Sequence, residues 1–160
     1  MTVTKGGLNP RTHQLTVREL EALIFGRTRS ELADAVALDS RIERAWRLIE
    51  EGYGDPKLSA RTVARSVGLS EYHLRLLMRE STGLTVRELI TRHKLMKAAL
   101  LMQMRDRKML AVAMDAGFGS AGAFTRNFAE VLGMTPGAFR KEWTVLGQGQ
   151  IPGYEPTFSK

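Results

Sequence analysis

The feature that most constrains the fold of this chain is an internal repeat, in which two segments about 50 residues apart share one pattern. The first copy contains Val63-Ala64-Arg65-Ser66-Val67-Gly68, and the second contains Val112-Ala113-Met114-Asp115-Ala116-Gly117. Five later positions match at a distance of fifty residues: Ser70 and Ser120, Leu74 and Phe124, Met78 and Phe128, Gly83 and Gly133, Thr85 and Thr135. Each copy predicts a short helix, a turn at a glycine and a second helix capped by serine. That order of elements is typical of a helix-turn-helix.

The remainder of the chain favours helices as well, so the expected fold class is all-α, with no strand. Capping-box patterns at Thr16–Glu19, Ser40–Glu43 and Thr85–Glu88 predict the starts of three helices, and Ser30 predicts the cap of another. The third capping box should begin a long linker helix that reaches about Met104 and joins the two copies. The predicted architecture is therefore two helix-turn-helix subdomains joined by a long helix, with a short helical extension before them.

These patterns divide the chain into three parts. We expect a partly helical N-terminal extension at 1–38, a domain holding both copies at 39–143, and an irregular tail at 144–160. Within the domain, the first helix-turn-helix is expected at 59–80, the linker helix at 85–104 and the second helix-turn-helix at 109–132. Six aromatic residues at helical spacing are expected in the core, the last of them inside a helix that begins at Thr135: Trp46, Phe118, Phe124, Phe128, Phe139 and Trp143.

Composition limits the classes of function. The formal net charge of +7, concentrated in residues 39–143, favours polyanionic partners such as nucleic acid or an acidic membrane surface. The absence of cysteine removes thiolate metal sites and cysteine nucleophiles, and fits a reducing cytoplasm. His13, His73 and His93 lack metal-ligand spacing, and His93 is expected at the surface. We therefore expect no enzyme, no cofactor, no metal and no membrane span.

The spacing within each copy fits a reader of DNA. Gly68 and Gly117 supply the left-handed backbone conformation of the turn, while Ala64 and Ala113 leave room for the crossing helix. Serine caps then leave the amino end of each second helix facing outward, where a phosphate can bind. A second helix of this kind can lie in a major groove of double-stranded DNA.

These residues resemble the C-terminal DNA-binding domain of the AraC/XylS transcription regulators, over about Ser40 to Trp143. The second half carries the more specific resemblance, through Ala113, Gly117-Phe118, Ser120, Phe124, Arg126, Phe128, Gly133, Thr135-Pro136 and Phe139-Arg140. The resemblance implies seven helices and two recognition helices that enter successive major grooves of an asymmetric site, about one helical turn apart.

The resemblance also implies roles for residues of the first copy. The base-reading positions fall on Tyr72, Arg75 and Leu76, and Arg75 is the best candidate for a bidentate contact with guanine. Tyr72 could pack on a thymine methyl or bond to a phosphate. Leu76 departs from the arginine often found at its position. Arg79 and the cap Ser70 are expected at the DNA backbone.

In the second copy, the base-reading positions fall on Ala121, Ala123, Thr125 and Arg126, and Ser120 is expected at the backbone. The segment Ala121-Gly122-Ala123 has no side-chain donor or acceptor, which leaves two interpretations. Its small side chains could let the helix approach closely and rest on thymine methyls. Alternatively, this motif mainly anchors phosphates while the first reads the sequence, which is the interpretation we favour. Arg140 is either structural or phosphate-facing.

The sequence thus predicts a bacterial, cytoplasmic and nucleoid-associated transcription regulator whose partner is double-stranded DNA. The residues before the domain are too few for the sugar-binding barrel of longer family members, so we expect no directly bound small-molecule effector and a stand-alone regulator. The alternative is an interaction protein that acts mainly by binding RNA polymerase or another transcription factor, with weak reading of DNA.

Overall fold

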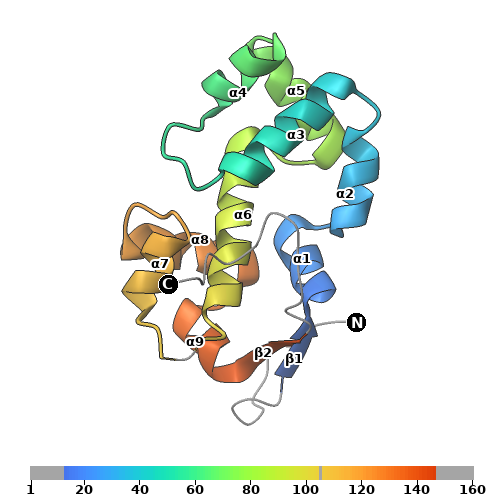
Figure 1. The fold of residues 1–160 in the computed structure, drawn as a ribbon. Coiled ribbons are helices and arrows are strands. Elements are labelled where there is room, and N and C mark those ends of the chain that lie inside the picture. Colours follow the sequence, from blue (N-terminus) through green and yellow to red (C-terminus); the bar gives the residue numbers. More distant parts are fainter. Residues whose placement is uncertain (1–12, 105, 147–160) are drawn as a thin grey trace.

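The computed structural model describes residues 13–104 and 106–146. Within these ranges the chain is mostly helical, which confirms the all-α class, and it adds two short strands (Figure 1). In chain order the elements are β1 (His13–Thr16), α1 (Val17–Phe25), α2 (Arg29–Val36), α3 (Ser40–Gly52), α4 (Ala60–Val67), α5 (Glu71–Thr82), α6 (Val86–Leu101), α7 (Met109–Asp115), α8 (Ala121–Leu132), α9 (Pro136–Glu142) and β2 (Trp143–Leu146).

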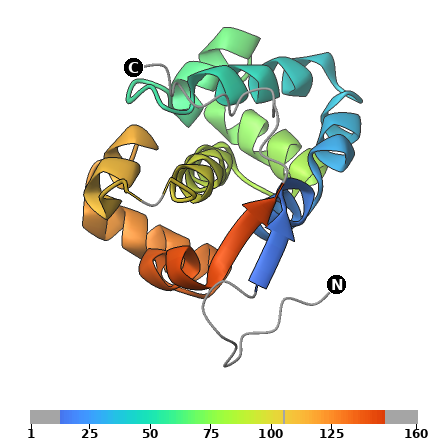
Figure 2. The ribbon, with the colours of Figure 1, turned by 60° about the horizontal axis from the view of Figure 1, so that its bottom comes forward.

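The linker helix α6 has α3–α5 around one end and α7–α9 around the other (Figure 1). Figure 2 looks nearly along α6 and shows it in the middle of the molecule. Its start is fixed by a reciprocal capping box between Thr85 and Glu88. Its buried residues lie on more than one face, because other helices cover it on several sides. The seven helices α3 to α9 match the number that the family resemblance implies.

The six aromatic residues expected in the core are all buried. In the second copy they form a continuous row, in which Phe124 lies 5.6 Å from Phe128 and Phe128 lies 5.4 Å from Phe139, ring centre to ring centre. Both pairs meet edge to face, the geometry that aromatic rings prefer. These residues therefore hold α8 and α9 together.

The expectation of no strand was wrong. β1 and β2 pair in parallel, with His13 opposite Trp143 and Thr16 opposite Leu146. Trp143, expected in the last helix, has extended backbone angles and ends α9. The pairing also includes Thr144 and Val145 of the segment expected to be an irregular tail. Strands of four residues whose partners are far apart in sequence leave almost no periodic signal.

Three helix boundaries differ from those expected. Asp39, rather than Ser40, caps α3, and its carboxylate accepts a hydrogen bond from the backbone N–H of Arg41. Thr28, rather than Ser30, caps α2. The helix α6 ends at Leu101, before Met104. For α2 and α3 a neighbouring residue offered an equivalent cap, which is where sequence patterns discriminate least. Beyond α6 the chain continues in i→i+3 turns as far as Met104.

His93, expected at the surface, is buried in α6. Its ring lies 4.9 Å from that of Phe25, 5.5 Å from Trp46 and 5.4 Å from Tyr53, measured between ring centres. Burial also raises the pKa of Tyr53 to about 12. His93 therefore belongs to the aromatic core where α1, α3 and α6 meet.

Candidate nucleic-acid interface

The first helix-turn-helix consists of α4, a three-residue turn and α5. Gly68 occupies the left-handed region at φ 74°, as the sequence predicts, and the N–H of Leu69 donates to the carbonyl of Ala64 at 2.9 Å. Ser70 then caps α5, because its hydroxyl accepts a hydrogen bond from the N–H of His73 at 3.1 Å. The cap is exposed, so the amino end of α5 is open to an anion.

The three predicted base-reading residues of α5 all lie on its exposed surface. Tyr72 is 63% exposed and Leu76 is 47% exposed, while Leu74 and Met78 on the opposite side are buried. The guanidinium carbon of Arg75 lies 5.4 Å from the centre of the Tyr72 ring, within the range of a cation–π contact. The structure thus brings Tyr72 and Arg75 together on one open face.

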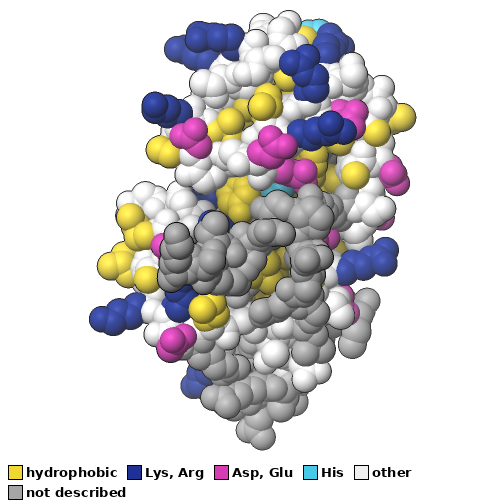
Figure 3. Space-filling view, viewed as in Figure 1, with side chains coloured by type: hydrophobic (Ala, Val, Ile, Leu, Met, Phe, Trp, Pro, Cys, Tyr) yellow, Lys and Arg dark blue, Asp and Glu magenta, His cyan; other side chains and the backbone are white. Residues whose placement is uncertain are grey.

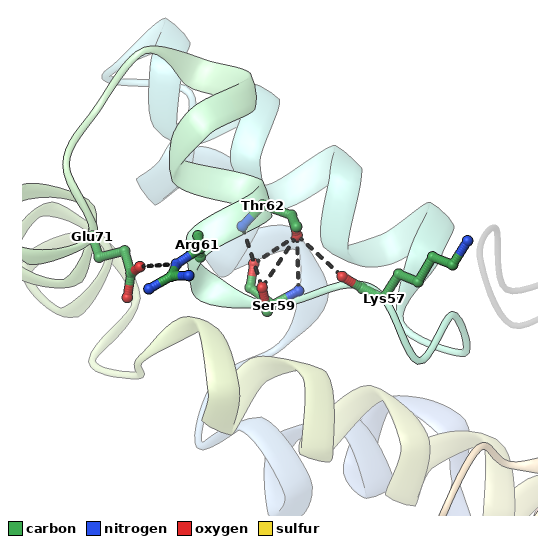
Figure 4. A network of polar contacts seen from close by, with 5 residues as sticks. All are labelled: Lys57, Ser59, Arg61, Thr62 and Glu71. Carbon is green, nitrogen blue, oxygen red and sulfur yellow. Dashed lines mark hydrogen bonds and ion pairs between the residues drawn. The ribbon is translucent and has the colours of Figure 1, made fainter.

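An ion pair connects α4 to the start of α5 and was not foreseen from the sequence. Arg61 Nε donates to a carboxylate oxygen of Glu71 at 3.1 Å (Figure 4). The same figure shows the capping box of α4, in which the hydroxyls of Ser59 and Thr62 accept from each other's backbone N–H groups. The only sequence signal was an acidic residue directly after the Ser70 cap. Glu71 places a negative charge beside the predicted readers.

A hollow lies beside this face, between α4, α5 and the start of α6. Its lining includes Tyr72 and Arg75 together with Glu71, Thr85 and Arg87. Arg87, in the first turn of α6, is exposed and is a second cation there that the sequence analysis missed. Figure 3 shows Lys and Arg side chains spread over the end of the molecule where α4 and α5 lie.

Arg79 and Arg140, predicted at the DNA backbone, differ in setting. Arg79 is exposed, and Nη2 lies 3.7 Å from a carboxylate oxygen of Glu88. Arg140 is half-buried, and within the described part of the chain its Nε and Nη2 are buried without a hydrogen-bond partner. The role of Arg140 therefore stays a prediction.

The second helix-turn-helix repeats the geometry of the first with α7 and α8. Gly117 has φ 97°, and the N–H of Phe118 donates to the carbonyl of Ala113 at 3.0 Å. Ser120 caps α8 by accepting from the N–H of Ala123 at 3.1 Å. The turn is more crowded than the first, because Lys94 of α6 crosses it with its ammonium nitrogen 5.9 Å from the centre of the Phe118 ring. Partial burial lowers the pKa of Lys94.

The exposed face of α8 has little chemistry of its own. Ala121, Thr125 and Arg126 are exposed, and Ala123 is half-buried. A Cβ placed on Gly122 would meet only the hydroxyl of Ser120, at 4.0 Å, so the packing of the chain does not require glycine there. The small side chains on this face therefore leave room for a partner to approach α8, and the fold itself does not require them.

The first helices of the two motifs present different surfaces. The exposed side of α4 carries Arg61 and Arg65, whereas the corresponding positions of α7 carry Leu110 and Met114. Those two apolar side chains are 59% and 53% exposed, and hydrophobic side chains are visible where α7 reaches the edge of the molecule (Figure 3). The positive charge next to a recognition helix is thus concentrated in the first motif.

Among the described residues, no helix is both long and apolar enough to cross a membrane, and no cluster of three metal-ligating side chains occurs. The fold and its exposed helices define a protein with two helix-turn-helix motifs.

Comparison with known proteins gives the family. A family model described as a helix-turn-helix domain matches residues 63–142, which is half of the chain. The chain belongs to the AraC/XylS family of helix-turn-helix transcription regulators.

Over the segments that align, relatives are between a quarter and a third identical to this chain. The right origin-binding protein of Escherichia coli strain K12 is 32% identical over 99 residues, which cover 61% of this chain and 34% of that protein. The probable transcription factor PqrA of Proteus vulgaris is 33% identical over 84 residues, covering 52% of this chain and 69% of PqrA. The chain therefore spans about a third of the length of the first relative.

Solved structures support the fold. The C-terminal domain of AraT, a response regulator from Geobacillus stearothermophilus, aligns with a TM-score of 0.62 at 20% identity, covering 71% of this chain and 93% of that domain. At this level of identity the similarity concerns the fold alone.

Proposed function

We propose that this chain regulates transcription by binding double-stranded DNA at an asymmetric site, with α5 and α8 inserted into successive major grooves. The observation that carries the proposal is the open face of α5, where Tyr72, Arg75 and Leu76 lie beyond an exposed serine cap. An arginine at such a position can donate two hydrogen bonds to guanine, and each good bidentate pair discriminates by about 1–3 kcal/mol. Family membership and the name of PqrA support the same function.

We further propose that the two recognition helices have different roles in DNA binding. α5 reads bases through Arg75, with Tyr72 on a thymine methyl or a phosphate, and Leu76 adds an apolar contact. α8 binds the DNA backbone and approaches the groove closely, since Ala121, Gly122 and Ala123 leave its exposed surface free of long side chains. Thr125 and Arg126 are the residues of α8 that can reach a base edge. Ser70, Ser120 and Arg79 hold phosphates.

The test is selection of bound sequences from a random duplex pool with the full chain at near-physiological salt. The expected result is one conserved block, read by α5, beside a less specified block about 10 base pairs away. Two equally conserved blocks would show that α8 reads bases as strongly as α5. If no sequence is enriched, the chain is no sequence-specific DNA reader and the proposal is wrong.

The matched variants are Arg75→Ala, in the α5 face, and Arg65→Ala, on the exposed side of α4. Arg75→Ala should remove one base preference from the selected block. Arg65→Ala should leave the selected sequence unchanged, because Arg65 belongs to neither recognition helix. Loss of the same preference in both variants would contradict the role given to Arg75.

A further inference from the structure

We propose that residues 13–38, closed against β2, form a brace that fixes the two recognition helices relative to each other and thereby sets the half-site spacing that the chain accepts. This inference rests on the proposed function for its DNA consequence, but its structural part can be tested without DNA. The brace consists of β1, α1 and α2, which lie outside the seven helices α3 to α9.

The brace extends from one motif to the other. At one end, β1 pairs with β2, which directly follows α9 of the second motif. In the middle, α1 packs against both α6 and α8, and at the other end α2 packs against α3 and α5. Figure 1 shows these elements following one side of the molecule from the strand pair to the first motif. One continuous segment of 26 residues therefore contacts both recognition helices.

Side-chain hydrogen bonds hold the brace at two points along its length, and a third bond holds the strand β2 with which it pairs. Arg92 Nη1 of α6 donates to the carbonyl of Ile24 at 2.6 Å, next to the end of α1. Arg27 Nη1, between α1 and α2, donates to the carbonyl of Ser81 in α5 at 3.3 Å. At the strand pair, the N–H of Val145 donates to Oε1 of Gln103, just beyond α6.

The brace also contributes to the core. Buried apolar side chains occur in each of its elements: Leu15, Val17, Leu20, Ile24, Phe25, Leu32 and Val36. In β1 the alternation is clear, since Leu15 is buried while its neighbours Gln14 and Thr16 are exposed. A segment buried in this way cannot shift without exposing apolar surface, so it resists relative movement of the elements it contacts.

Without the brace, α6 would be the main connection between the motifs. Among the described residues, the larger helix contacts between the two ends of the molecule pass through α6 and α1. The turn of the second motif also lies close to the segment between α3 and α4, since a Cβ built on Gly117 would be 3.4 Å from the Cα of Gly54. In addition, the N-cap of α7, Lys108, makes no side-chain hydrogen bond to the helix.

The consequence for DNA follows from duplex geometry. A change of one base pair between two half-sites moves the second by about 3.4 Å and turns it by about a tenth of a helical turn. A rigid pair of recognition helices cannot follow such a change, whereas a pair joined only through α6 can bend toward it. The brace should therefore make DNA binding sensitive to the number of base pairs between the two half-sites.

The structural test measures the distance between α5 and α8. Because the chain has no cysteine, Glu80→Cys and Glu130→Cys give two unique spin-label sites, exposed and fifty residues apart in the repeat. Leu15→Asp should open the strand pair, and Gln14→Asp is the matched control that adds the same charge on the exposed side of β1. We expect a single narrow distance distribution in the parent and in Gln14→Asp, and a broad one in Leu15→Asp.

A narrow distribution in a folded Leu15→Asp protein would overturn the brace. Circular dichroism establishes whether that variant is folded. If Leu15→Asp is unfolded, the double variant Arg27→Ala with Arg92→Met replaces it in the distance measurement. The double variant removes the two side-chain hydrogen bonds of the brace and introduces no buried charge. A broad distribution in the double variant supports the brace, and an unchanged one contradicts it.

The DNA test uses the selected site with its two blocks moved together or apart by one base pair. The parent and Gln14→Asp should lose affinity at the wrong spacing, by up to about tenfold, because Thr125 and Arg126 of α8 then miss the bases of the less specified block. The brace variants should lose less. Equal spacing sensitivity in all variants would contradict the inference. If no duplex binds, the proposed function fails, and the distance distributions still decide whether the brace exists.

Discussion

Tyr72 and Arg75 form a small surface unit rather than two separate side chains. The 5.4 Å contact between the guanidinium and the ring restricts Arg75 to fewer rotamers before any partner arrives. A long side chain that is already oriented loses less entropy when it binds a base.

The first prediction concerns Arg75, whose removal should weaken discrimination between base pairs at one position of the DNA site. Arg75→Ala should cost about 1–3 kcal/mol at the selected site and relax specificity at one base pair. Titration of the selected duplex and of its single-pair variants would measure both effects. An equal loss on every sequence would mean that Arg75 contacts phosphate.

At Gly122 the second prediction separates DNA binding from stability. Gly122→Leu should keep or raise the thermal midpoint, because the position is open and leucine favours helix by up to about 1 kcal/mol over glycine. The same variant should weaken duplex binding, since its side chain fills the space in front of α8. Thermal unfolding and duplex titration of one preparation would check this. Unchanged affinity would place the DNA away from Gly122.

At the scale of elements, the two helix-turn-helix motifs share a plan but not an environment. Both turns use a glycine with positive φ. A Cβ on Gly68 would meet nothing within 4 Å, whereas one on Gly117 would lie 3.3 Å from Cε of Lys94 and 3.4 Å from the Cα of Gly54. The second turn is therefore constrained by its neighbours as well as by its own backbone.

The third prediction compares the two turns. Gly68→Ala should destabilise the chain by about 1–2 kcal/mol, the cost of left-handed backbone for a residue with a Cβ. Gly117→Ala should cost more, because Lys94 and the backbone at Gly54 would also have to move. Urea unfolding of both variants provides the comparison. Equal losses would show that the neighbours of Gly117 adapt freely.

At the scale of the whole molecule, the net charge of +7 gives the fourth prediction. The logarithm of the DNA-binding constant should fall linearly with the logarithm of salt concentration, by about 0.9 for each phosphate neutralised. Arg79→Ala should make this slope shallower by about one phosphate and weaken all sequences alike. Fluorescence titrations between low and physiological salt measure the slope. Salt-insensitive binding would favour the alternative of a partner-binding protein.

How far the sequence predicts this molecule depends on how local each signal is. The capping boxes at Thr16, Ser59 and Thr85 involve residues within one turn, and sequence reading could find the helices they start. The glycine turns follow from the repeat, and the exposed positions of α5 follow from the family resemblance. The pairing of β1 with β2 and the burial of His93 depend on segments far apart in the chain, and no local pattern indicates them.

The parallel strand pair also has a consequence for how the chain is made. His13 and Trp143 are 130 positions apart, so β1 leaves the ribosome long before its partner exists. During synthesis the apolar side of β1, with Leu15, has no strand to pair with until both helix-turn-helix motifs are complete. A nascent chain stopped at Glu142 would contain both recognition helices and lack the strand that joins the two ends of the described fold.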